Sequence, residues 1–200
     1  FYDVTEGRIT IDGKDVRSLT LNSLRNQIGL VQQDVYLFCG TIRENIAYGK
    51  PQATMEEIIE AAKKANIHDF IEELPDGYDT FVGERGTRLS GGQKQRIAIV
   101  RALAMNPKLL FVSEPTRGID IGAKKLVLET LVRLNREKGM TVVMVSSELM
   151  ELRSICDRIA IVAEGKMVDV LETNASDADF GLAMSGIKPE HVKQLSLIHI

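Results

Sequence analysis

The residues best suited to carry out chemistry form the run LSGGQKQR at 89–96, which continues into an apolar stretch ending at Leu103. Ser90, followed three residues later by Gln93, is a capping box and predicts that a helix begins here. Gly91 and Gly92 would leave the first turn without side chains, so a ligand could approach the free N–H groups at the positive end of the helix dipole. Such a terminus suits a phosphate group, although a capped core helix without a ligand would show the same residues.

The rest of the chain must position this run, and its pattern alternates between strands and helices. Apolar runs bounded by polar residues predict buried strands, and capping residues predict helix starts. The predicted strands are 8–11, 28–32, 108–112, 141–145, 158–163 and 166–171. The predicted helices are 19–26, 41–48, one that opens at Thr54, 67–74, one from Ser90 to the stop at Asn106-Pro107, 121–138 and 148–155.

Strands and helices that alternate with short links indicate an α/β fold built on a parallel sheet. We expect one domain over residues 1–171, with a mainly helical subdomain inserted at about 41–105 and the α/β core at about 106–171. The periodic pattern fades after Glu172, so residues 172–200 are expected to form a poorly ordered tail.

The composition limits the classes of function. The 200 residues carry a net charge of −3, and no cluster of Lys and Arg indicates a nucleic-acid partner. Cys39 and Cys156 give neither a disulfide framework nor a metal-ligand spacing, which favours a reducing compartment. No apolar run approaches the ~20 residues of a membrane helix. Any role at a membrane would therefore be that of a part docked on membrane domains.

The run at 89–96 and the apolar helix after it resemble the signature motif of ABC-type ATPases, the nucleotide-binding cassettes of ABC transporters. Residues 1–112 resemble an exporter cassette, because the segments 29–38, 40–49 and 82–86 match as well. Residues 114–171 resemble instead the second cassette of a sugar-importer ATPase, through 114–124 and 146–149. The change of resemblance at Ser113, where the sequence also matches a translated sequencing adapter, predicts a chimera of two genes.

The resemblance implies an ATPase whose ATP hydrolysis drives transport at the cytoplasmic face of a membrane. Two cassettes would sandwich two ATP molecules head to tail and dock on transmembrane domains. The signature residues Ser90, Gly91 and Gly92, with the capping Gln93, would contact the γ-phosphate of ATP held by the partner cassette.

The resemblance also implies the residues that act on water and magnesium. Gln33 matches the glutamine that reaches Mg²⁺ and the attacking water, and Glu114 matches the catalytic carboxylate that polarises this water. Asp120 matches the aspartate of the loop between the two active sites, and an ordinary helix N-cap is compatible with that role. Read alone, Gln33 would be a loop amide and Glu114 a surface residue at a strand end.

Three departures from the family pattern limit this interpretation. The P-loop motif G-x-x-x-x-G-K-[ST] does not occur, and its usual place just before a segment like 1–4 predicts a truncated P-loop NTPase fold with Ile28, Leu30, Leu110 and Val143 exposed. Ser113 stands where an aspartate would help to hold Mg²⁺, and Ser147 stands where a histidine would contact ATP.

These departures predict that the chain alone is inactive, and they keep two alternatives open. One is a degenerate cassette that binds and assembles without hydrolysis. The other is a soluble ABC ATPase, against which the exporter-like segment 40–49 argues.

Overall fold

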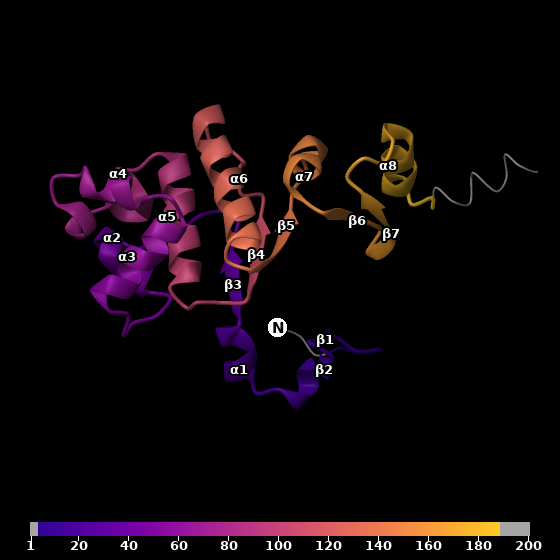
Figure 1. Cartoon of the computed structure of the whole chain (residues 1–200), viewed down its shortest axis with the longest axis horizontal. Coiled ribbons are helices and arrows are strands. Elements are labelled where there is room, and N and C mark those ends of the chain that lie inside the picture. Colours follow the sequence, from indigo (N-terminus) through magenta and orange to yellow (C-terminus); the bar gives the residue numbers. More distant parts are fainter. Residues whose placement is uncertain (1–3, 189–200) are drawn as a thin grey trace, which may run out of the picture. The chain divides into compact units, whose positions relative to one another are not determined.

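The computed structural model describes residues 4–188, which fall into two units, Phe1–Val145 and Ser146–Ile200 (Figure 1). The first unit contains the hairpin β1 (Thr10–Ile11) and β2 (Lys14–Asp15), the strands β3 (Ile28–Val31), β4 (Leu109–Ser113) and β5 (Thr141–Val145), and the helices α1 (Leu21–Asn26), α2 (Ile42–Ala47), α3 (Met55–Lys64), α4 (His68–Glu72), α5 (Gly91–Leu103) and α6 (Ile121–Arg136). The second unit contains α7 (Leu149–Ile155), β6 (Arg158–Ala163), β7 (Lys166–Glu172) and α8 (Asp177–Met184).

The three longer strands of the first unit form one parallel sheet in the order β3-β4-β5. Its register places Leu30, Phe111 and Val143 in one row across the sheet, on the face opposite Leu110. Leu30 is 59% exposed and Val143 40% exposed, whereas Leu110 is fully buried. The expectation of exposure was therefore right for Leu30 and Val143. It was wrong for Leu110, whose face packs against α5 near Ala102.

The segment between β3 and β4 is helical, as its capping boxes predict. Thr41 caps α2 with Glu44, and Thr54 caps α3 with Glu57; in each case both reciprocal hydrogen bonds are present. The apolar faces of these helices meet α5 in a core that is closed to solvent, formed by Ile42, Ile46, Ile58, Ala62, Ile67, Ile71, Ile97, Val100 and Leu103. This core holds α5 so that its N-terminal turn emerges at the surface.

The structure of the second unit differs from two expectations. β6 was predicted within the parallel core, but it pairs antiparallel with β7 through the Glu164–Gly165 turn, where both residues have positive φ. The tail after Glu172 was predicted to be poorly ordered, but Ser176 caps α8. Phe180 buries its ring against Ile159 and Ile161 of the hairpin, and this contact orders the segment. Residues 189–200 lie outside the described residues.

Candidate phosphate site and the carboxyl edge of the sheet

The N-terminus of α5 has the geometry that the capping box predicts. The Gln93 N–H donates to Ser90 Oγ at 3.3 Å, and the Ser90 N–H donates to Gln93 Oε1 at 2.9 Å. The helix that follows has 13 residues, long enough for its dipole to favour a negative charge at this end. Ser90 and Gly91 are exposed, so the first turn offers backbone N–H groups toward solvent.

The two glycines of this turn serve different purposes. A β-carbon on Gly92 would overlap the Cβ of Ala123 on α6, and Gly92 is buried. A β-carbon on Gly91 would lie 3.0 Å from the Cγ2 methyl group of Ile119 and 3.4 Å from the Gly118 carbonyl oxygen, which is close but without overlap. Gly92 is thus required for close packing of two helices, and only Gly91 presents an open surface. The predicted phosphate contact of the Gly92 backbone stays a prediction.

Asp120 lies at the start of α6, beside the same turn of α5. Its side chain accepts a hydrogen bond from the Ala123 N–H at 2.9 Å, so the N-cap interpretation is confirmed. Because Ala123 also packs on Gly92, this cap fixes the position of α6 against the signature turn. Ile121, the first residue of α6, is 88% exposed.

The second group of predicted residues lies where β3 and β4 end. Val31 pairs with Val112, so Gln33 and Glu114 each follow this pair by two residues at the carboxyl edge of the sheet. Ser113 is the last residue of β4 and pairs with Val145 of β5. Carboxyl ends of parallel strands are the usual place for ligands in such folds. The register therefore brings Gln33, Ser113 and Glu114 to one edge.

Glu114 has an unusual backbone at this edge. Its φ is +44°, in the left-handed region that few residues other than glycine adopt. Its N–H donates to Val145 O at 2.8 Å, and its carbonyl accepts from the Arg117 N–H at 3.2 Å. These bonds hold a strained conformation at the point where the chain leaves β4, and such strain is concentrated at functional sites.

The donors at this edge fit magnesium in type, since Gln33, Ser113 and Glu114 all offer oxygen. They supply one negative charge, because Ser113 is neutral. Within residues 4–188, no group of three or more His, Cys, Asp or Glu side chains could hold a metal ion. A magnesium ion here would need the phosphates of a nucleotide as further ligands.

Ser147 belongs to the second unit and is described with its own neighbours. It is exposed in the turn before α7, next to Ser146, whose Oγ accepts a hydrogen bond from the Glu148 N–H at 3.0 Å. Its predicted contact with ATP stays a prediction.

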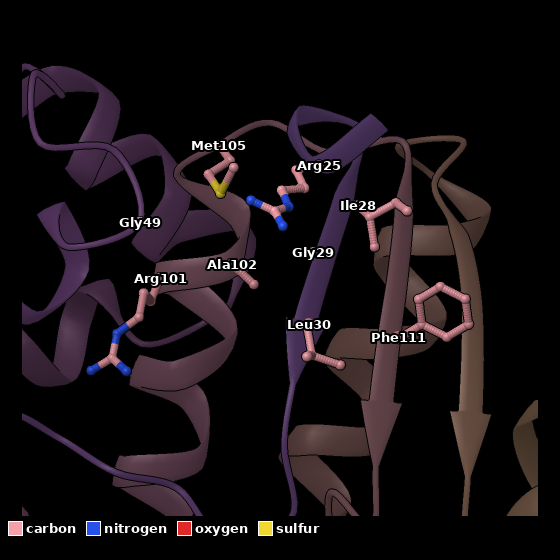
Figure 2. Close-up of a pocket in the computed structure, with 9 residues that line it drawn as sticks. All are labelled: Arg25, Ile28, Gly29, Leu30, Gly49, Arg101, Ala102, Met105 and Phe111. Atoms are coloured by element: carbon pink, nitrogen blue, oxygen red, sulfur yellow. The ribbon is translucent and has the colours of Figure 1, made fainter. Parts of the chain in front are cut away.

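Sequence reasoning missed a pocket and the residues around it. A cavity of about 430 Å³ lies between β3 and the C-terminal half of α5. Figure 2 shows its lining residues, Arg25, Ile28, Gly29, Leu30, Gly49, Arg101, Ala102, Met105 and Phe111. Partial burial lowers the pKa of the Arg101 guanidinium from its usual value. The only signal in the sequence was Arg101 itself, a charged residue within the apolar stretch 97–103.

Comparison with known proteins places this geometry in a family. A profile described as ABC transporter matches residues 1–117. The putative multidrug export ATP-binding/permease protein YgaD of Bacillus subtilis is 49% identical over 170 residues, which are 85% of this chain and 29% of that protein. Multidrug resistance protein 1 of Entamoeba histolytica is 49% identical over 171 residues, which are 84% of this chain and 13% of that protein.

A solved structure agrees with these relatives. A bacterial Atm1-family ABC exporter with ATP bound is 40% identical and superposes with a TM-score of 0.77, over 97% of this chain and 32% of that one. The chain belongs to the ABC transporter family, as the resemblance predicts, and its α/β fold with a parallel sheet is the predicted class. It spans under a third of the length of these relatives. No helix in the part of the chain that the structure describes is long and apolar enough to span a membrane.

Proposed function

We propose that the chain is part of the ATP-binding and ATP-hydrolysing subunit of an ABC transporter, and that the N-terminus of α5 binds the γ-phosphate of ATP held by a second cassette. The observation that carries this proposal is the capped, exposed first turn of a 13-residue helix at Ser90 and Gly91. Its N–H groups and the helix dipole both favour a phosphate. A hydrogen bond to a charged group is worth roughly 1.5–3 kcal/mol, so this end contributes part of the affinity for ATP and cannot hold the nucleotide alone.

The carboxyl edge of the sheet has the complementary role. The Glu114 carboxylate accepts a hydrogen bond from water and aligns it for in-line attack on the γ-phosphate. The Gln33 amide reaches the same water and, with Ser113, supplies oxygen toward Mg²⁺, which would neutralise phosphate charge when bound. Asp120 would fix the loop that links this edge to the signature turn, because it caps α6 beside Gly92.

The roles proposed for the signature turn and for the carboxyl edge of the sheet imply which partners the chain has. Membership of the ABC transporter family supports a second cassette, arranged head to tail, that brings the nucleotide to the signature turn. The Bacillus relative is described as an ATP-binding/permease protein, which supports transmembrane domains as the other partner and the cytoplasmic face of the membrane as the location.

A second candidate function is a cassette that binds and assembles without hydrolysis. Ser113 favours it, since a neutral hydroxyl at the end of β4 gives Mg²⁺ no charge. The two candidates differ in turnover and agree in binding, so an assay of hydrolysis separates them.

The test is steady-state phosphate release with Mg²⁺-ATP by five proteins. They are the chain, Ser113→Asp, Ser147→His, the chain extended before Phe1 by a strand–P-loop–helix segment of the family, and the extended chain with Ser113→Asp. If the chain hydrolyses ATP, we expect turnover in both extended proteins, faster after Ser113→Asp, and its loss on Glu114→Gln; turnover only after Ser113→Asp would favour the second candidate. Turnover by the unextended chain that Glu114→Gln abolishes would contradict the proposal, because the phosphate site would then lie elsewhere. Turnover by the extended chain without Ser113→Asp would remove the second candidate.

A further inference from the structure

Arg101 connects the far half of the signature helix to the loop that carries Gln33. Its Nη1 donates to the Tyr36 carbonyl at 3.0 Å, and its Nε donates to the Asn45 carbonyl at 2.9 Å. Its Nη2 donates to Asn45 Oδ1, also at 2.9 Å. The planar guanidinium therefore donates three hydrogen bonds, and their acceptors belong to residues that lie 56 and 65 positions away in the sequence.

Asn45 completes this connection from α2. Its side chain is buried, 1% exposed, and its Oδ1 accepts a hydrogen bond from the Phe38 N–H at 2.8 Å. Its Nδ2 donates to the Phe38 carbonyl at 2.9 Å and to the Thr41 carbonyl at 3.0 Å. Both backbone groups of Phe38 are thus bound by one side chain, which Arg101 in turn holds.

Contacts of the Arg101 guanidinium with aromatic rings, and a buried leucine, support the same arrangement. The Arg101 guanidinium lies 5.3 Å from the ring centre of Phe38 and 5.8 Å from that of Tyr48, and these two rings stack at 4.2 Å. Leu37 is fully buried and faces Gly86, which precedes the signature turn. The loop 33–38 follows β3 of the sheet, and hydrogen bonds with α2 and α5 hold its far end.

We propose that Arg101, acting with Asn45, is a positioning residue that makes the position of Gln33 follow the position of the signature helix. The inference rests on the proposed function for its catalytic consequence: a displacement of α5 by a partner's nucleotide would be transmitted through Arg101 to Tyr36 and Phe38 and so to Gln33. Lysine cannot replace arginine here, because one ammonium group cannot serve two carbonyls and Asn45 Oδ1 in the same fork geometry.

The experiment measures hydrogen exchange and the NMR spectrum of the ¹⁵N-labelled 200-residue chain, without nucleotide. In Arg101→Lys we expect the Phe38 amide to exchange about tenfold faster or more, because its acceptor Asn45 is no longer held. The Gln33 side-chain NH₂ resonances should shift, while the amides in the middle of α5 and in β4 keep their protection. Tyr48→Ala removes one ring from the guanidinium at a side chain that is 62% exposed, so it leaves the fold intact and should raise Phe38 exchange about two- to threefold.

The matched control is Arg133→Lys. Arg133 also donates to backbone carbonyls, those of Lys63 and Lys64, but it ties α6 to α3 instead of holding the Gln33 loop. This control should leave the Phe38 amide and the Gln33 resonances unchanged. The proposal is overturned if Arg101→Lys speeds exchange in α5 and β4 as much as at Phe38, or if neither Arg101→Lys nor Tyr48→Ala changes Phe38 exchange. Because none of these measurements requires ATP, a failure of the proposed function would not alter their outcomes.

Discussion

Gly92 of α5 approaches Ala123 of α6 so closely that a β-carbon on Gly92 would overlap the Cβ of Ala123. Ala123 is also the residue whose N–H is held by the Asp120 cap. The signature turn, the start of α6 and the loop after Glu114 therefore form one packed junction. A glycine in this run is needed for packing as well as for any ligand.

The first prediction concerns this junction. Gly92→Ala should lower the free energy of unfolding by about 1–3 kcal/mol, because the added methyl group forces α5 and α6 apart. Gly91→Ala is the matched control: its new methyl group would lie 3.0 Å from Ile119 Cγ2 and 3.4 Å from the Gly118 carbonyl oxygen, without the overlap found at Gly92, and alanine favours a helix by about 0.8–1 kcal/mol over glycine. Urea unfolding of the three proteins measures the difference. Equal midpoints for the two variants would contradict the packing role of Gly92.

The second prediction concerns the two faces of the sheet. Leu110→Ala should cost about 2–5 kcal/mol, since Leu110 is fully buried on the face toward α5. Leu30→Ala, on the opposite face at 59% exposure, should change the free energy of unfolding by less than about 1 kcal/mol. Thermal and urea unfolding monitored by circular dichroism would check both values. A larger loss for Leu30→Ala than for Leu110→Ala would show that the faces are wrongly assigned.

Most of the local structure could be predicted from the sequence, because caps and periodicity are local signals. The capping boxes at Thr41, Thr54 and Ser90 mark helices that begin within one residue of the expected place. What could not be predicted depends on distant partners. The hydrogen bonds of Arg101 span 56 residues or more, and α8 is ordered by Phe180 packing on a hairpin rather than by its own periodicity.

The same distinction applies to the site. The order of Ser90, Gly91 and Gly92 indicated a phosphate-binding turn, but only the structure separated the exposed Gly91 from the buried Gly92. The common edge of Gln33 and Glu114 follows from the strand register, which the sequence does not state.

The third prediction concerns pH. Burial raises the pKa of Tyr78 to about 12, and its hydroxyl lies 2.9 Å from His68 Nδ1. An unfolded tyrosine loses its proton near pH ~10, so the stability that Tyr78 contributes is present below this pH and is lost as the pH rises to about 12. Urea midpoints should fall by the equivalent of about 2 kcal/mol over this range, and less steeply in Tyr78→Phe. Identical slopes for both proteins would contradict the assignment.

The fourth prediction concerns the origin of the sequence at Ser113. The alignment with the Bacillus relative covers 85% of the chain, and the predicted join of two genes at Ser113 stays a prediction. Amplification and sequencing of the source DNA across codons 105–120 should give no continuous product with this sequence. One continuous product that encodes Ser113 would contradict the join.

The most direct test of the central claim is association with a cassette that carries a P-loop. We would mix the fluorescently labelled chain with the ATP-binding part of the Bacillus relative and follow sedimentation with Mg²⁺-ATP or Mg²⁺-ADP. The account predicts a complex with ATP that weakens at least about tenfold in Gly91→Asp, because a carboxylate at the first turn of α5 repels the γ-phosphate. Gly181→Asp, at a glycine of α8 with no atom near a new β-carbon, should bind as the unchanged chain does. Equal complex formation by Gly91→Asp, or with ADP in place of ATP, would contradict the claim that this turn binds a partner's γ-phosphate.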